Sequence, residues 1–302
     1  MSKIIVTAVL TTYKRPIKMV KRALESMIRQ TYREMEIIVV NDYPEDTFLS
    51  KQIKDLVLKY EKSRAVYYYD TIKNSGACFA RNLGLRYAKG KYIAFLDDDD
   101  EWLPEKIQKQ VNCLEKNNYS LCYINWNIYE DGVKKRVKYN VDQPSGNILD
   151  ILCKKNIIGS CSFPLIRTEC IKNVGGFNEK LPALQDIDLY IRIMRNGTAF
   201  YIRDVLAVYH YHNGERISSN NKRRAIAVDF MLDEYKEWMD EKSVAYSNFL
   251  LKAAYFHTNS GQYKKALKEC VLAINANPKN LKDCVHTLLR IPLCMIRGEK
   301  KY

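Results

Sequence analysis

The sequence predicts an α/β protein with a Rossmann-like, mostly parallel sheet flanked by helices and a small all-α C-terminal region. Short β-rich runs alternate with amphipathic stretches over the first hundred residues, which is typical of βαβ units that build a parallel sheet. After Ser218 the pattern is dominated by helix. The chain has 302 residues, 47% of them hydrophobic, so it is long enough to bury one large core or two unequal ones.

The elements of the first hundred residues follow from the period of the apolar side chains. β-rich apolar runs predict four strands, over residues 4–10, 35–42, 65–70 and 91–100. The amphipathic stretches between them predict three helices, over residues 16–30, 47–62 and 75–90. In such a parallel sheet the carboxyl ends of the strands lie at one edge, and ligands bind in the crevice beyond them.

The rest of the chain mixes strands and helices. Residues 120–129 and 133–141 are predicted to be sheet-edge strands, and 199–212 a further strand. Residues 186–197 are predicted to form a helix with Asp in its first turn and Gly at its end. Residues 249–280 match a single tetratricopeptide-like helix pair, with small residues where the two helices cross.

We therefore expect two domains, over residues 1–218, with halves 1–100 and 101–218, and over residues 219–302, with the helix pair at about 247–280. One such pair is too short for a solenoid, so it is expected to pack against the preceding domain, and it is a candidate surface for a protein partner or for self-association. The final "LLRIPLCMIRGEKKY" combines apolar and basic residues. This pattern suits either a packed helix with a solvated basic end or peripheral contact with an anionic membrane.

Charge and cysteine content narrow the class of protein. Lys and Arg outnumber Asp and Glu by 49 to 35, and a formal charge of +14 favours a phosphate-bearing substrate, an acidic membrane surface or nucleic acid. Nine scattered cysteines without a CxxC pair argue against a disulfide framework and for a reducing compartment. The N-terminus is typical of a core strand rather than a signal peptide, so we expect a cytoplasmic protein, with the inner face of the cell membrane as a further location.

Four consecutive aspartates, Asp97 to Asp100, follow the fourth predicted strand. Like charges this close repel one another, and a hard divalent cation such as Mg²⁺ or Mn²⁺ offsets that repulsion. Polar clusters also follow the first strand ("TTY") and the second ("ND"), so the three strand ends are expected to converge on one crevice. The alternatives are a solvated acidic loop, or a helix start that Asp100 or Glu101 caps.

Six segments of the chain occur in an order known from one enzyme family: "TTYKRP", "EIIVVND", "NSGACFARNLGL", "YIAFLDDDDEW", "GGFNE" and "LQDIDLYIRI". Together they resemble the family 2 glycosyltransferases, which have the GT-A fold. The resemblance runs from about Ile4 to Ser219. It implies a GT-A type sheet and an inverting transfer of a sugar from a nucleotide-sugar.

The resemblance implies a nucleotide site built from four residues. Asp42 matches the Asp that accepts a hydrogen bond from the donor base, and a carboxylate suits a uracil N3–H, which favours a UDP-sugar; the alternative is a turn-forming "ND". Thr11 and Tyr13 match the loop beside the nucleotide, where Tyr13 would stack on the base or serve only in packing. Arg81 matches a basic residue near the nucleotide, with a structural ion pair as its alternative.

The metal motif of the family fits this sequence in two registers, Asp97-x-Asp99 and Asp98-Asp99. Both include Asp99, which is therefore the first candidate ligand, with Asp97 as a second. Asp97 or Asp98 would otherwise address the ribose or a bridging water. His210 and His212 share one face of a predicted strand, and some family members use a histidine from this region for the metal or acceptor; core or surface roles are the alternative.

The resemblance places the catalytic base at Asp186, in a helix start where the family often has Glu-Asp and this chain has Gln185-Asp186. The missing acid puts any role of position 185 in doubt, but not that of Asp186. Asp188, two residues further on, is expected to cap or orient the turn. Arg216 and Ser218 are weaker candidates for contact with phosphate or acceptor.

The sequence thus predicts an inverting glycosyltransferase that depends on Mn²⁺ or Mg²⁺. It would move a sugar from a UDP-sugar to a hydroxyl of a glycan or lipid-linked acceptor, in the synthesis of a bacterial surface polysaccharide. Two other classes remain open. One is a noncatalytic scaffold that recruits partners through its helical tail, and the other is a two-metal nucleic-acid enzyme, which lacks a recognisable binding motif here; we expect no nucleic acid partner.

Overall fold

A computed structural model describes residues 5–130, 133–137, 142–211, 220–241 and 243–290. These residues divide into two compact units. The first takes in Met1–Asn147, Ile158–Glu179 and Arg192–Asn213, and the second takes in Ile148–Ile157, Lys180–Ile191 and Gly214–Tyr302. The helical unit thus includes two short segments that come from within the α/β part of the sequence.

The described residues of the first unit form one nine-stranded mixed sheet. Its parallel half has the order β3 (Ala65–Asp70), β2 (Met35–Asn41), β1 (Val6–Thr12) and β4 (Tyr92–Asp97). The second half continues with β8 (Leu165–Arg167), β6 (Leu121–Glu130), β9 (Ala199–Tyr211) and β5 (Glu101–Trp102), and β7 (Val133–Val137) pairs with β6. β8 runs antiparallel to both of its neighbours, β4 and β6, so β6 and β9 run in the same direction as β4, whereas β5 and β7 run in the opposite direction. The predicted α/β class with a GT-A type sheet is confirmed.

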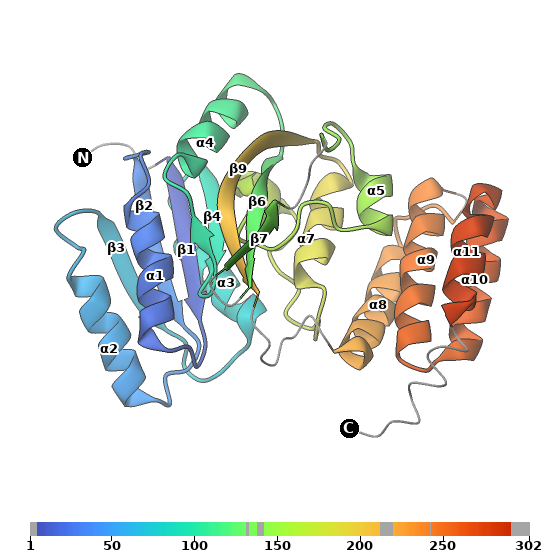
Figure 1. The fold of residues 1–302 in the computed structure, drawn as a ribbon, viewed down its shortest axis with the longest axis horizontal. Coiled ribbons are helices and arrows are strands. Elements are labelled where there is room, and N and C mark those ends of the chain that lie inside the picture. Colours follow the sequence, from blue (N-terminus) through green and yellow to red (C-terminus); the bar gives the residue numbers. More distant parts are fainter. Residues whose placement is uncertain (1–4, 131–132, 138–141, 212–219, 242, 291–302) are drawn as a thin grey trace. The chain divides into compact units, whose positions relative to one another are not determined.

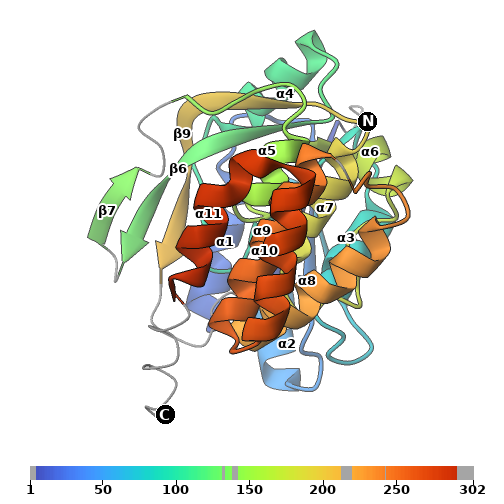
Figure 2. The same ribbon diagram turned by 90° about the vertical axis from the view of Figure 1, so that its right-hand side faces the viewer.

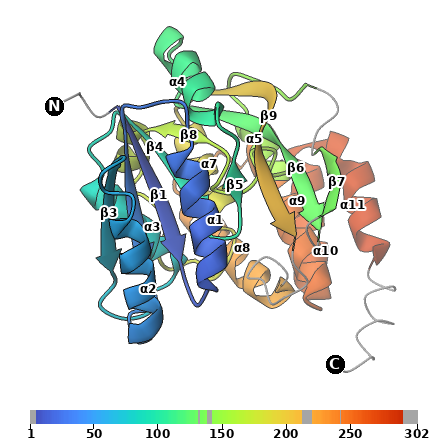
Figure 3. The same ribbon diagram turned by 60° about the vertical axis from the view of Figure 1, so that its left-hand side comes forward.

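Helices cover both faces of the parallel half (Figure 1, Figure 3). α1 (Ile17–Ile28) and α2 (Thr47–Leu58) share one hydrophobic cluster with the side chains of Ala8 and Leu10. α3 (Ala77–Tyr87) meets the intervening residue, Val9, from the opposite face. Side chains alternate between the faces of a strand, so β1 is buried on both sides, and Val6, Ala8, Val9 and Leu10 are fully buried. The same unit holds α4 (Lys106–Lys116) and α6 (Thr168–Asn173).

The second unit is helical. It contains α5 (Leu149–Lys154), the first turns of α7 (Gln185–Met194), α8 (Asn221–Tyr235), α9 (Val244–Asn259), α10 (Tyr263–Ala276), the short 3₁₀ helix η2 (Pro278–Asn280) and α11 (Leu281–Leu288). α9 packs against α5, α8, α10 and α11, and Figure 2 shows α9, α10 and α11 side by side. Asn280 joins them by donating to Ser247 Oγ at 2.8 Å and to Asn248 Oδ1 at 3.0 Å. Across the described part of the chain, no helix is both long and apolar enough to cross a lipid bilayer.

Candidate active site

The aspartate turn, Asp97 to Asp100, begins at the last residue of β4. The Asp100 amide donates to the Asp97 carbonyl at 3.1 Å, which closes the turn. Its side chains alternate in exposure: those of Asp97 and Asp99 are 28% and 24% exposed, whereas Asp98 and Asp100 are buried. Among the described residues no side chain caps α4, so neither Asp100 nor Glu101 is a helix cap. The turn therefore presents two carboxylates outward and holds two inward.

The two inward carboxylates are held by groups from distant parts of the chain. Asp98 accepts hydrogen bonds from Arg15 Nε at 2.8 Å and from the Tyr13 amide at 3.3 Å, and burial raises its pKa to about 6. Asp100 accepts from Ser162 Oγ at 2.6 Å and from the His210 amide at 3.4 Å. Burial raises the pKa of Asp100 well above its usual range. These contacts fix the backbone that carries Asp97 and Asp99.

The two outward carboxylates are paired with arginines. Asp99 Oδ2 lies 3.1 Å from Arg15 Nη2. Asp97 Oδ1 lies 2.7 Å from Arg81 Nη2, and its Oδ2 accepts from Ser160 Oγ at 2.9 Å. Partly exposed carboxylate oxygens at a strand end are the donor set that a hard divalent ion takes, so these residues fit the predicted Mn²⁺ or Mg²⁺.

Strand register explains why the predicted nucleotide residues come together. Thr11 in β1 pairs with Val40 of β2 on one side and with Asp97 of β4 on the other. The three parallel strands therefore end at the same level, and Tyr13, Asp42 and the aspartate turn follow at one edge of the sheet. The expected convergence of three strand ends is observed.

Asp42 is buried and holds the loop that leads into α3. Its Oδ1 accepts from Thr71 Oγ1 at 3.1 Å and from the Ser75 amide at 2.9 Å, and its Oδ2 accepts from the Gly76 amide at 2.8 Å. Gly76 has a φ of +90°, a backbone conformation that favours glycine. Asp42 is thus a loop anchor in this structure, and its contact with a donor base stays a prediction.

Two tyrosine rings, those of Tyr13 and Tyr43, lie next to each other at the edge of the sheet where the three parallel strands end. The rings of Tyr13 and Tyr43 meet edge to face with centroids 5.5 Å apart, and Lys14 Nζ lies 4.5 Å from the Tyr43 centroid. The Tyr13 hydroxyl accepts from Asn74 Nδ2 at 3.1 Å. Tyr13 is 41% exposed, so its ring is available to a flat partner such as a nucleobase.

His210 lies in β9 and faces Glu101, the residue after the aspartate turn. Its Nε2 lies 2.6 Å from Glu101 Oε1, and this hydrogen bond lowers the pKa of Glu101. Glu101 also lies 3.3 Å from Arg22 Nε. The predicted metal role of His210 is not tested by this arrangement. His212, Arg216 and Ser218 lie outside the described residues.

Asp186 lies in the first turn of α7, at a helix start as the sequence predicts for the base, and this turn belongs to the helical unit. Its Oδ2 accepts a hydrogen bond from Asn156 Nδ2 at 3.0 Å. Asp188 is buried and accepts from the Tyr235 hydroxyl at 2.8 Å, so it ties α7 to α8. The two acids of this helix therefore lie in different surroundings.

Comparison with known proteins decides the family. Residues 7–175, more than half of the chain, match the model of a protein family described as "Glycosyl transferase family 2". This chain belongs to glycosyl transferase family 2. It is 30% identical to the uncharacterized glycosyltransferase RC0461 of Rickettsia conorii, over 87% of this chain and 44% of that protein. It is 27% identical to the putative colanic acid biosynthesis glycosyl transferase WcaA of Escherichia coli, over 76% of this chain and 81% of that one.

Solved structures show the same fold as this family 2 chain. S. aureus TarS 1–349, crystallised with UDP-GlcNAc, has a TM-score of 0.69 at 17% identity and matches 99% of this chain and 93% of that chain. Mannosyltransferase PcManGT from Pyrobaculum calidifontis, in complex with GDP-Man and Mn²⁺, has a TM-score of 0.61 at 18% identity, over 95% of this chain and 80% of that chain. The chain spans 38% to 44% of the length of the first three Rickettsia relatives that it matches.

Several residues of the site in this family 2 chain are not apparent from sequence reasoning. They are Arg15, Arg22, Tyr43, Ser160 and Ser162. Arg15 belongs to the "TTYKRP" segment, which was a usable signal, but no spacing rule pairs it with the aspartates. The two serines precede β8, and only the sheet brings them to the aspartate turn.

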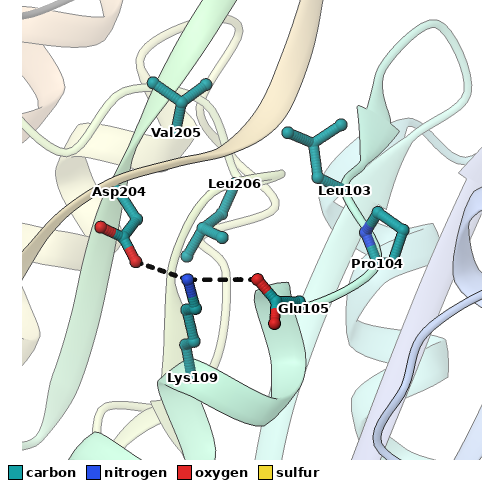
Figure 4. A pocket seen from close by; sticks show the side chains of 7 residues that line it. All are labelled: Leu103, Pro104, Glu105, Lys109, Asp204, Val205 and Leu206. Atoms are coloured by element: carbon teal, nitrogen blue, oxygen red, sulfur yellow. Dashed lines mark hydrogen bonds and ion pairs between the residues drawn. The ribbon is translucent and has the colours of Figure 1, made fainter.

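Two other features of this family 2 chain involve none of the predicted site residues. A surface hollow between α4 and β9 is lined by Leu103, Pro104, Glu105, Lys109 and Asp204 to Leu206 (Figure 4). Lys109 bridges its two acids there, at 3.2 Å from Glu105 and 2.7 Å from Asp204. None of the predicted site residues lines this hollow.

In the helical unit, the buried His257 lies between Glu269, 2.7 Å from Nδ1, and Asp229, 3.2 Å from Nε2. The two acids lie beside different ring nitrogens, and Lys265 also pairs with Asp229. One ligand atom from each of Asp229, His257 and Glu269 lies within 4.8 Å of the others. These contacts link α8, α9 and α10.

Proposed function

We propose that this protein is an inverting, metal-dependent glycosyltransferase that moves a sugar from a UDP-sugar to an acceptor hydroxyl. The observation that carries the proposal is the aspartate turn, which presents Asp97 and Asp99 at the sheet edge where Tyr13 and Asp42 also lie. Membership of family 2 supports the reaction class.

The donor nucleotide is assigned to the edge formed by Thr11, Tyr13 and Asp42. A carboxylate has two oxygens with about four acceptor sites, and Asp42 uses three of them, so one remains for a uracil N3–H. The exposed ring of Tyr13 would stack on the base. The TarS structure holds UDP-GlcNAc on the same fold, which agrees with a UDP-sugar.

The metal is assigned to Asp99 and Asp97, whose carboxylates are partly exposed. When bound, a divalent ion supplies Lewis-acid stabilisation of the negative charge that develops on the departing diphosphate. Arg81 and Ser160 hold the Asp97 carboxylate in a fixed orientation for this task. His210 keeps its Nε2 on Glu101, so it supports the residue after the turn rather than acting as a ligand in this proposal.

Asp186 is assigned as the general base. The acceptor hydroxyl gives its proton to Asp186 while its oxygen forms a bond to the anomeric carbon. The bond from that carbon to the diphosphate breaks, and its electron pair leaves with UDP. One displacement of this kind inverts the anomeric configuration. Asn156 orients the Asp186 carboxylate by its hydrogen bond.

The acceptor class proposed is a glycan or lipid-linked glycan of a bacterial surface polysaccharide. WcaA, a relative of this chain, is named for colanic acid biosynthesis. The excess of basic residues, with a formal charge of +14, suits anionic substrates and an anionic membrane surface. The proposed location is therefore the cytoplasmic side of the cell membrane, with the basic C-terminal segment as the predicted contact.

Calorimetric titration of UDP tests the donor site. We expect binding with Mn²⁺, loss of binding with EDTA, and loss in Asp99→Ala. Asp204→Ala is the matched control, since Asp204 is an exposed acid of the same unit that lies in the separate hollow of Figure 4. Equal UDP binding by Asp99→Ala and the unmodified protein would remove the metal assignment. Failure to bind UDP under any condition would favour the noncatalytic scaffold.

A further inference from the structure

We propose that Arg15 is an exchangeable counter-ion of the aspartate turn, so that the divalent metal and the nucleotide diphosphate bind together and each binds poorly alone. This inference rests on the proposed function and adds to it a residue that controls how the donor site is loaded.

One guanidinium bridges two neighbouring carboxylates of different exposure. Arg15 Nε lies 2.8 Å from Asp98 Oδ1, and its Nη2 lies 3.1 Å from Asp99 Oδ2. Asp98 is 7% exposed and Asp99 is 24% exposed. The Arg15 side chain is itself 38% exposed, so it can leave Asp99 without vacating a buried position. Arg15 therefore neutralises the turn while no metal is bound.

A divalent ion at Asp99 and the Arg15 guanidinium compete for the same carboxylate. Two cations a few ångströms apart repel, and the ion must break a charge-assisted hydrogen bond to reach the Asp99 oxygen. A diphosphate changes this balance, because its oxygens offer the displaced guanidinium a bidentate anionic partner. Metal and nucleotide should then raise each other's affinity by the same factor, as linkage requires.

The neighbouring arginines do not have this property. Arg22 donates to the backbone carbonyl of Asp99 at 2.8 Å and lies 3.3 Å from Glu101, and neither of these contacts is with a carboxylate of the turn. Arg81 pairs with Asp97, but its side chain is only 11% exposed and packs over the Phe177 ring at 5.4 Å. Arg15 thus combines contact with a proposed ligand and freedom to move.

The test is a thermodynamic cycle measured by calorimetry on the full chain: Mn²⁺ alone, UDP alone, Mn²⁺ with saturating UDP, and UDP with saturating Mn²⁺. In Arg15→Gln we expect affinity for Mn²⁺ alone to rise about tenfold, which corresponds to about 1.4 kcal/mol. The factor by which Mn²⁺ and UDP strengthen each other should fall by a similar amount. Arg15→Lys keeps the positive charge but lacks the forked donor groups of a guanidinium. Its affinity for Mn²⁺ alone and its coupling factor should therefore lie between those of Arg15→Gln and of the unmodified protein.

Arg22→Gln is the matched control, because it removes the same charge near the turn without freeing a carboxylate of Asp98 or Asp99. We expect its coupling factor to stay that of the unmodified protein. An equal change in Arg22→Gln and Arg15→Gln would overturn the inference in favour of a general field effect, and so would an unchanged coupling factor in Arg15→Gln. If Arg15→Gln fails to fold, Arg15→Gln with Asp98→Asn, compared with Asp98→Asn alone, gives the same comparison. Absence of UDP binding in every protein would instead contradict the proposed function itself.

Discussion

The carboxylate of Asp42 and the amide of Gly76 are joined by a hydrogen bond of 2.8 Å, which ties the end of β2 to the start of α3. The same carboxylate accepts from Ser75 and Thr71, so one side chain organises the loop in front of α3. α3 carries Arg81, which in turn holds Asp97. This loop and helix therefore connect Asp42, the proposed contact of the nucleobase, with Asp97, a proposed metal ligand.

Asp42→Ala should lower the free energy of unfolding by about 1–3 kcal/mol, because the Ser75 and Gly76 amides and the Thr71 hydroxyl lose a charged acceptor. Urea denaturation measures this change. Thr71→Val is the control: it removes one of the three bonds and leaves the two amide bonds, so its loss should be smaller. A loss in Asp42→Ala no larger than that in Thr71→Val would contradict the anchoring role.

Lys106 makes the stability of the fold depend on pH. It is fully buried, donates to Gln110 Oε1 at 2.8 Å, and lies 4.2 Å from the Trp102 ring centroid. Burial lowers its pKa to about 7, whereas in the unfolded chain it titrates near its ordinary value of about 10.4. Between these values the unfolded chain binds more protons, so stability rises with pH over about 7 to 10.4 and is constant below.

Lys106→Met should therefore raise the free energy of unfolding at pH 7, by about 4 kcal/mol at most, and flatten its pH dependence. Urea denaturation at pH 7, 8 and 9 measures both effects. Lys252 is the comparison, since burial lowers its pKa to about 8 in the helical unit, where it donates to the Leu152 carbonyl at 2.5 Å. Lys252→Met should leave unchanged the contribution of Lys106 to the increase of the free energy of unfolding with pH.

Ser162 supports the aspartate turn at two points. Its Oγ accepts from the Asp97 amide at 3.1 Å and donates to Asp100 at 2.6 Å. Ser162→Ala should lower the free energy of unfolding by about 1–3 kcal/mol and weaken UDP binding with Mn²⁺, because the turn loses a buried partner. Ser160→Ala removes the bond to the outward Asp97 carboxylate and should cost less stability. Equal stability losses in the two variants would show that burial of Asp100 is not the cause.

Gly84 is required where α3 crosses β1. A Cβ at this position would lie 2.4 Å from Val9 Cγ1, well inside van der Waals contact. Gly84→Ala should lower the free energy of unfolding by about 1–3 kcal/mol despite the higher helix propensity of alanine. The double variant, Gly84→Ala with Val9→Ala, should lose less stability than the sum of the two single losses, because the smaller side chain at position 9 relieves the clash. Additive losses in the double variant, measured by urea denaturation, would exclude the steric explanation.

Asp186→Asn should lower the rate of sugar transfer by about 10² to 10⁴ while leaving UDP binding unchanged, because it removes the proposed base and keeps the size of the side chain. The rate of transfer is measured with a UDP-sugar that the unmodified protein uses as donor, and UDP binding is measured by calorimetry. Asp188→Asn is the comparison, since Asp188 is buried against Tyr235 and should affect stability first. An unchanged rate of sugar transfer in Asp186→Asn would show that another group acts as the base.

Much of the fold could be predicted from the sequence. Periodicity located β1, β2, β3 and β4 with the helices between them, because a strand buried on both faces is rich in apolar residues and its crossover helix has one apolar face. Polar residues directly after three of these strands predicted a common edge. The family could also be identified, since six motifs occur in its order.

The short β5 and β8 could not be predicted, because strands of two and three residues carry no period. Arg15 and Ser162 were missed for a related reason. They lie 83 and 62 residues from their aspartate partners, and no local pattern links such positions.

The sequence by itself determined the α/β class, the order of β1 to β4 and of the helices between them, and the edge where the acidic and nucleotide-contacting candidates gather, because these follow from local patterns of burial and turn chemistry. The tertiary structure alone decided which aspartates face outward and which cation holds each of them. Those choices depend on the curvature and register of the sheet, which bring an arginine from the end of β1 and serines from before β8 to the same four residues.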